Sequence, residues 1–188
     1  MKTINQIYFR LKITLIGILF FQIQAGFSQE EKNSELYKTI MSKDSLLFNI
    51  GFNTCDLSQF ENLFSDDLEF YHDKGGMSDK ILFIKNFKKG ICGSTGTYKS
   101  RRYLVPNTTE VYPLYNRGVL YGAMQMGIHQ FYEKSVDENE SLANAKENFG
   151  STARFTHVWI LINGVWKLRR AFSYDHQTEN SSKTEKKS

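Results

Sequence analysis

Apolar residues recur at helical spacing in three stretches of the N-terminal half of the chain. Residues 30–52, a short segment after Asp56, and residues 78–89 each carry one apolar face, which predicts three helices. Asp56 and Gln59 have the spacing of a capping box at the start of the second helix. Residues 67–72, between the second and third helices, alternate between apolar and polar positions and are predicted to form a strand.

From residue 97 onward the apolar period changes to that of strands. Strands are expected at 99–105, 108–114, 119–133, 153–162 and 165–176. Gly122 and Gly127 lie inside the longest of these, which indicates bulges or a strong bend. Asn163 and Gly164 form the strongest two-residue hairpin signal. Because helices that precede a curved sheet must cover one of its faces, the pattern predicts an α+β fold with a curved antiparallel sheet of about five to six strands wrapped around three N-terminal helices.

The chain begins with the three parts of a signal peptide. A basic start without acidic residues precedes an apolar stretch at 13–23, and the small residues Gly26 and Ser28 follow it. The basic residues are Lys2, Arg10 and Lys12. About 11 apolar residues are too few for a bilayer core, which needs roughly 20. Residues 1–28 are therefore predicted to be a cleavable signal peptide. We expect export to the periplasm or the cell exterior, with no stable membrane anchor after cleavage.

Removal of this segment changes the charge of the protein. It takes three basic residues from a formal net charge of +4 and leaves about +1. A nearly neutral domain has no electrostatic reason to bind nucleic acid, so no nucleic-acid partner is expected. Lys99, Arg101 and Arg102 are interpreted as a solvated strand face. The folded domain is expected over residues 29–176, and the polar residues 177–188 are expected to form a disordered tail.

The two cysteines, Cys55 and Cys92, leave two alternatives open. An oxidising compartment permits a disulfide between them, and two buried free thiols are the other alternative. Their wide spacing, with no Cys-x-x-Cys pair, argues against metal ligation. The chain also contains 15 Phe, 10 Tyr and 2 Trp, which is many for its size. An aromatic core of this kind can enclose a cavity as well as fill itself.

Two segments carry a resemblance to a known family. One is DDLEFYHDKGG at 66–76, which follows a helix pair and precedes a third helix, and the other is the closing hairpin FTHVW…NGVWKL at 155–168. With this order of elements the chain resembles the nuclear-transport-factor-2-like superfamily and its SnoaL-like group, closest to bacterial domain-of-unknown-function family 4440. The resemblance implies a cone-shaped, half-open sheet with a pocket at its wide end, and frequent homodimers.

The same resemblance implies relatives of several functional kinds. They include ketosteroid isomerases, scytalone dehydratase and polyketide cyclases, beside proteins that bind ligands or only associate. The acid/base Asp of those isomerases and cyclases is not placed on any residue of this chain. A fold shared by so many activities does not by itself choose among them.

The closing hairpin predicts which side chains share the concave face of the sheet. With a two-residue turn and regular pairing, His157 lies opposite Arg170, Trp159 opposite Leu168, and Phe155 opposite Phe172. Together with residues from other strands, this aromatic face gives the candidate ligand pocket: His72, Tyr121, His129, His157, Trp159, Arg170, Phe172 and Tyr174. A pocket of this composition suits a small apolar or aromatic ligand.

Arg170 is expected either to hold a carboxylate or carbonyl of that ligand or to pair with an acidic residue, because a buried cation needs compensation. The available acidic partners are Glu69, Asp73 and Asp175. The opposite face of the hairpin carries Val158, Ile160 and Ile162, an apolar set that predicts a homodimer contact.

Three functions fit these features. The first is an exported small-molecule-binding domain. The second is an enzyme of the isomerase, dehydratase or cyclase type that uses His72, His129 or His157 for proton transfer. The third is a non-catalytic association module whose pocket is filled by its own side chains. Each histidine taken alone also fits a hydrogen-bonded core residue. No cofactor is expected, because the sequence has no Gly-rich phosphate loop, and no metal, because it has no close histidine spacing.

Overall fold

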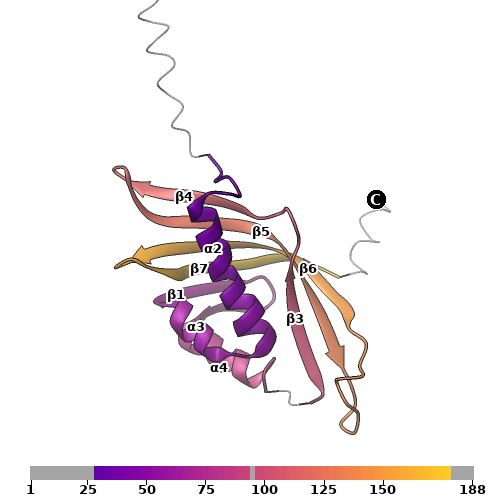
Figure 1. Ribbon diagram of the computed structural model, residues 1–188. Coiled ribbons are helices and arrows are strands. Elements are labelled where there is room, and N and C mark those ends of the chain that lie inside the picture. Colours follow the sequence, from indigo (N-terminus) through magenta and orange to yellow (C-terminus); the bar gives the residue numbers. More distant parts are fainter. Residues whose placement is uncertain (1–27, 94–95, 179–188) are drawn as a thin grey trace, which may run out of the picture.

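The computed structural model describes residues 28–93 and 96–178, with the chain arranged as in Figure 1. The predicted signal peptide, apart from Ser28, lies outside the described residues, and so does the predicted tail from residue 179 onward. Within the described ranges, no helix is both long enough and apolar enough to cross a membrane.

The helices lie where the apolar spacing predicts them. They are α2 (Glu35–Ser45), η1 (Leu46–Phe52), α3 (Leu57–Leu63) and α4 (Lys80–Lys89). The π-helix η1 continues α2 directly, so the two make the single first helix of the prediction. Asp56 caps α3 as expected, since its side chain accepts from Ser58 N–H. The cap of α4 is Asp79, whose carboxylate accepts from Leu82 N–H.

In the described part of the chain, seven strands form one sheet in the order β2-β1-β7-β6-β5-β3, and β4 also pairs with β5. The strands are β1 (Phe64–His72), β2 (Gly76–Asp79), β3 (Tyr98–Leu104), β4 (Glu110–Asn116), β5 (Val119–Ser135), β6 (Asn148–Ile162) and β7 (Val165–Gln177). The fold is α+β with a curved, open sheet, as expected. Two details differ: β2 was not predicted, and β1 pairs with β7 in parallel, so the sheet is mixed. A parallel pairing between the first and last strands depends on tertiary packing that no local pattern encodes.

The helices lie together on the concave face of the sheet (Figure 1). The predicted bulge in β5 occurs next to Gly122, where the register with β4 shifts. A Cβ on Gly122 would lie 2.7 Å from the carbonyl oxygen of Trp159, and one on Gly127 would lie 2.8 Å from the ring of Phe155. These glycines allow β5 and β6 to approach closely and curve around the core. The core is made of helix and inner-face residues that include Ile40, Leu47, Phe60, Phe64, Phe87, Val111, Trp159 and Leu168.

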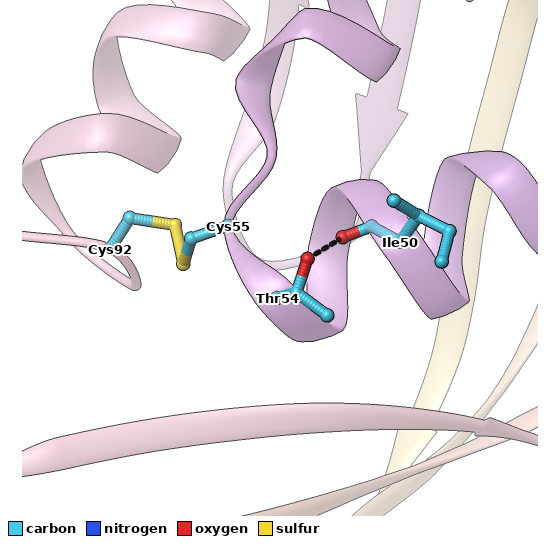
Figure 2. The surroundings of a disulfide bond; sticks show 4 residues. All are labelled: Ile50, Thr54, Cys55 and Cys92. Atoms are coloured by element: carbon cyan, nitrogen blue, oxygen red, sulfur yellow. Dashed lines mark hydrogen bonds between the residues drawn. A yellow bond between two sulfur atoms is a disulfide. The ribbon is translucent and has the colours of Figure 1, made fainter.

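Cys55 and Cys92 form a disulfide, so the structure selects the first of the two alternatives. Their Cα atoms are 5.8 Å apart and the sulfur atoms 2.03 Å. Figure 2 shows that Cys55 follows the end of η1, where Thr54 Oγ1 donates to the carbonyl of Ile50 at 2.6 Å. Cys92 follows the end of α4. The bond therefore ties the ends of two helices that cover the sheet.

Candidate functional site

A cavity of about 320 Å³ lies between the helices and the concave face of the sheet. Its wall is mainly aromatic and aliphatic, with Phe48, Phe52, Phe70, Phe83 and Phe131 among the lining residues. All four histidines of the chain line it as well: His72, His129, His157 and His176. A small number of polar groups in an apolar concavity is the usual composition of a ligand pocket.

The structure brings His72, His129 and His157 of the predicted set to this cavity. Trp159 is buried beneath its wall, and its indole N–H donates to Gln125 Oε1 at 2.9 Å. His176 also lines the cavity and was not among the predicted pocket residues. Regular alternation along β6 explains the correct placement of His157 and Trp159, since residues two apart in a strand point to the same face.

The predicted pairing of His157 with Arg170 is wrong. The hairpin begins as predicted, with Ile162 opposite Val165 and Trp159 opposite Leu168, but Val158 then pairs with Arg170. Arg169 is therefore an extra residue on β7, a bulge that reverses the alternation of the residues from Arg170 to Tyr174, up to a second register shift near Asp175. Ala171 and Ser173 face the cavity in place of the predicted residues.

The bulge moves Arg170, Phe172 and Tyr174 to the outer face of the sheet. On this face Arg170 does not line the cavity. Its Nε lies 2.9 Å from Oε2 of Glu69, with which it forms an ion pair. Glu69 is one of the three acidic partners considered from the sequence. Phe172 and Tyr174 line a shallow outer cleft, where the ring of Phe172 stacks on Tyr71 with centroids 5.0 Å apart.

Tyr121 also lies away from the cavity. Leu114 pairs with Gly122, and Tyr115 pairs with Leu120, so Tyr121 is the extra residue of a bulge in β5. Its side chain is 46% exposed. The interior face of β5 begins only after this bulge, with Ala123 and Gln125.

Beneath the cavity lies a buried ion pair that was not predicted. The two Nη atoms of Arg102 donate to the carboxylate of Asp44 at 2.8 and 3.2 Å. The guanidinium also lies over the ring of Phe48, 3.9 Å from its centroid. Arg102 is only 1% exposed, so its interpretation as part of a solvated strand face is wrong. The signal for Asp44 was present, since it lies between Ile40 and Leu47 on the apolar stripe of the first helix.

Gln125 connects this pair to the histidines. Its Nε2 donates to Asp44 Oδ1 at 3.0 Å, and its Oε1 lies 3.3 Å from His157 Nδ1. On the other side, Arg102 Nε donates to His129 Nδ1 at 3.3 Å. Every charged or amide group of the cluster thus has a partner, which compensates for its burial.

A second series of hydrogen bonds runs from His129 to the surface. Ser173 Oγ lies 3.4 Å from His129 Nε2 and 3.4 Å from His176 Nε2, and His176 Nδ1 lies 2.6 Å from Asp73 Oδ1. Because His129 Nδ1 accepts from Arg102, the proton of a neutral His129 is on Nε2 and points toward Ser173. Each group in the series can then donate to the next: Arg102 to His129, His129 to Ser173, Ser173 to His176, and His176 to Asp73.

Comparison with known proteins identifies the fold. Neither a known protein family nor a curated protein matches the chain at the level of sequence. Among solved structures, a nuclear-transport-factor-2-like superfamily protein from Salmonella enterica serovar Typhimurium is similar over 76% of this chain and 92% of its own, with a TM-score of 0.57 and 18% identity. The chain has the nuclear-transport-factor-2-like fold.

Two further structures agree with this assignment. ActVI-ORFA from Streptomyces coelicolor has a TM-score of 0.57 at 14% identity, over 77% of this chain and 98% of its own. A protein from Xanthomonas campestris that carries the name of a calcium/calmodulin-dependent protein kinase II association domain has a TM-score of 0.56 at 16% identity, over 81% and 97%. At these identities the similarity establishes the fold alone.

Both deeply buried histidines of the cavity are neutral near pH 7. Burial is the main cause that lowers the pKa of His129 to about 2, and the positive charge of Arg102 adds to it. Burial likewise lowers the pKa of His157 to about 3, with Asp44 opposing and Arg102 adding to the shift. Neutral imidazoles can donate and accept hydrogen bonds in the cavity without presenting a charge to a ligand.

At the rim, His72, Asp73 and His176 form a group of potential metal ligands. Their ligand atoms all lie within 4.8 Å of one another. The rings of His72 and His176 stack with centroids 4.4 Å apart. The sequence contains no close histidine spacing that would predict this group. Its residues come from opposite ends of the domain and are brought together by the parallel pairing of β1 and β7.

Proposed function

We propose that the cavity binds a small neutral molecule with an aromatic or otherwise apolar body and at least one hydrogen-bonding group. The observation that carries this proposal is the cavity of about 320 Å³, whose aromatic wall is interrupted by neutral His129 and His157. Its volume is at the lower end of the range for small-molecule pockets, about 300–1,000 Å³. A cavity of this size also favours a ligand-binding domain over an association module whose pocket is filled by its own side chains.

The charges around the cavity favour a neutral ligand over an anion. Arg102 is already paired with Asp44 and lies beneath the wall, and Arg170 is paired with Glu69 on the outer face. An anion bound in the cavity would therefore contact neutral imidazoles and no unpaired cation. The free-energy cost of removing the anion from water would then not be offset by an ion pair.

The fold and the sequence support two further parts of the proposal. We place the chain in the SnoaL-like group, nearest to bacterial domain-of-unknown-function family 4440, on the segments at 66–76 and 155–168. We also propose that the protein is exported after cleavage of residues 1–28. The disulfide between Cys55 and Cys92 supports this, because such bonds persist mainly in oxidising compartments.

A matched pair of ligands tests the proposal: 2-naphthol, a neutral aromatic alcohol, and 2-naphthoate, which has the same ring system and a carboxylate. Calorimetry on the exported protein should show that 2-naphthol binds at least about tenfold more tightly than 2-naphthoate. Intact-mass analysis of the same sample identifies the first residue of the exported chain. His157→Phe keeps a ring in place and removes the imidazole nitrogen, so it should weaken 2-naphthol binding by about tenfold, the effect of losing one hydrogen bond of about 1.4 kcal/mol.

Arg170→Met is the matched control, because Arg170 lies on the outer face and should not affect binding. Loss of binding in Arg170→Met, or binding of neither naphthalene ligand together with no co-purified small molecule by mass spectrometry, would contradict the proposal. The association module would then be the preferred function. The name of the Xanthomonas campestris neighbour, an association domain, supports assembly of this chain independently of any ligand.

The second candidate function is proton-transfer catalysis in the same cavity. The observation in its favour is the hydrogen-bonded series from His129 through Ser173 and His176 to Asp73, which gives a route for a proton between the cavity and its rim. Recovery of a bound ligand in chemically altered form, with His129→Gln retaining binding but losing conversion, would favour this candidate.

A further inference from the structure

Two strand ends meet at the rim of the cavity. β1 ends at His72, which pairs with Ser173 of the parallel strand β7. Beyond this pair, Asp73 N–H donates to the carbonyl of Ser173 at 3.1 Å, and His176 N–H donates to Asp73 Oδ2 at 3.1 Å. Asp175 has a φ of 60°, and the bulge at this position brings His176 back toward β1. The fold thus joins two imidazoles and one carboxylate from segments 103 residues apart.

The three side chains present their ligand atoms to one another. His176 Nδ1 lies 2.6 Å and His72 Nδ1 lies 3.4 Å from Asp73 Oδ1. Ligands of a tetrahedral ion with bonds of about 2.0–2.1 Å lie about 3.3 Å apart, so a small separation of these side chains accommodates an ion. We propose that His72, Asp73 and His176 bind a divalent transition-metal ion of the Zn²⁺ class.

The ion takes the place of contacts that the structure shows. It replaces the hydrogen bond between His176 Nδ1 and Asp73 Oδ1, and the single proton of the neutral imidazole then lies on Nε2, directed at Ser173 Oγ. It also displaces the turn hydrogen bonds that His72 Nδ1 accepts from the N–H groups of Lys74 and Gly75, both at 3.1 Å. Ser173 Oγ lies 3.4 Å from His176 Nε2, on the side of the ring away from the ion, and orients the imidazole.

The donor set selects the class of ion. Two imidazoles and one carboxylate suit Zn²⁺ and its transition-metal neighbours, whereas Mg²⁺ and Ca²⁺ prefer oxygen ligands only. Three protein ligands leave a position open for water or another ligand, as in catalytic zinc sites. His72 borders both the cavity and the outer cleft, so such a molecule has access from either side. This inference does not rest on the proposed apolar ligand, because it concerns the ion alone.

Calorimetric titration with Zn²⁺ tests the site. Tag-free mature protein with its disulfide intact, freed of metal by a chelator and dialysed at pH 7.5, should bind one Zn²⁺ per chain and should not bind Mg²⁺ at the same concentration. Asp73→Asn and His176→Gln should each weaken binding by more than about 100-fold, since even outer-shell partners of a metal contribute 10–100-fold. Asp175→Asn is the matched control: this carboxylate pairs with Arg154 at 3.3 Å, outside the group, and its loss should leave the affinity unchanged.

Absence of stoichiometric Zn²⁺ binding, equal binding of Mg²⁺, or wild-type affinity in Asp73→Asn would overturn the proposal. Asp73→Asn keeps an oxygen that accepts from His176 N–H, so its fold should persist, and near-UV circular dichroism without metal checks this. His72→Gln provides the same test if Asp73→Asn does not fold. Titration of these variants with 2-naphthol is a separate measurement, so failure of the metal site and failure of the apolar pocket are distinguishable.

Discussion

At the scale of single residues, the two buried histidines make the stability of the protein depend on pH. The folded state holds His129 with a pKa of about 2 and His157 with a pKa of about 3, because both are buried near Arg102. In the unfolded chain both return to the ordinary value of about 6.5. Between these values the unfolded chain binds more protons than the folded one, so the free energy of unfolding rises with pH. Stability is complete above about pH 6.5 and decreases as the pH falls toward the folded-state pKa values.

We therefore expect the free energy of unfolding to fall by about 2 kcal/mol for each of these histidines between pH 7.5 and pH 5. Urea denaturation at a series of pH values, with a chelator present, measures this. His157→Phe removes one of the two contributions, so its decrease over the same interval should be smaller by about 2 kcal/mol. Equal decreases in the wild type and the variant would show that His157 titrates normally in the folded protein.

The same residues show where sequence reasoning succeeds and where it fails. His157 and Trp159 were placed on the concave face correctly, because strict alternation in β6 needs only the sequence. Arg170 was placed wrongly because one bulge at Arg169 reverses the faces of β7, and a bulge has no reliable sequence signal when glycine is absent. Arg102 was misplaced for a different reason: an arginine is buried only when a partner such as Asp44 is available, and that partner is 58 residues away.

At the scale of elements, the disulfide holds the helices over the cavity. It joins the ends of η1 and α4, and Phe52 and Phe87 from these helices contact each other with ring centroids 5.0 Å apart in the cavity wall. The sequence separation of the cysteines is 37 residues. In the chain-entropy account, closing such a loop stabilises the folded state by on the order of 3–4 kcal/mol.

The double variant Cys55→Ser/Cys92→Ser should therefore lose about 3–4 kcal/mol of unfolding free energy, measured by denaturant titration without reductant. Addition of dithiothreitol should lower the thermal midpoint of the wild type and leave that of the double variant unchanged. A wild-type midpoint that does not respond to dithiothreitol, with full reduction verified by mass, would contradict a stabilising role for this bond.

At the scale of the whole molecule, element order and type were predictable, while strand partners were only partly so. Helical spacing and the Asn163-Gly164 turn identified the three helices and the closing hairpin. The pairing of β1 with β7 was not predictable, because it joins strands separated by most of the domain. That pairing also brings His72 to His176, so the rim group was outside the reach of any local motif.

The apolar outer face of the sheet predicts that the protein is a homodimer. Met124 pairs with Val158, and Thr156 pairs with Phe172, so these residues share the face that the helices leave uncovered. Met124, Val158 and Phe172, with Ile160 and Ile162, give this face an apolar patch bordered by Arg170 and Lys167, and such a patch is unfavourable to leave in water. We expect a second copy of the chain to cover this patch, because the same face on both partners makes a closed two-fold contact.

We expect light scattering at micromolar concentration to give the mass of a dimer, and Val158→Lys to convert it to a folded monomer by placing a charge at the centre of the contact. Ile81→Lys is the matched control, because Ile81 is 79% exposed on α4, on the helix side of the sheet, and its replacement should leave the dimer intact. A monomer mass for the wild type, or dissociation by Ile81→Lys but not by Val158→Lys, would contradict this assignment. In the second case the helix side would be the interface, and the apolar outer face would need another partner.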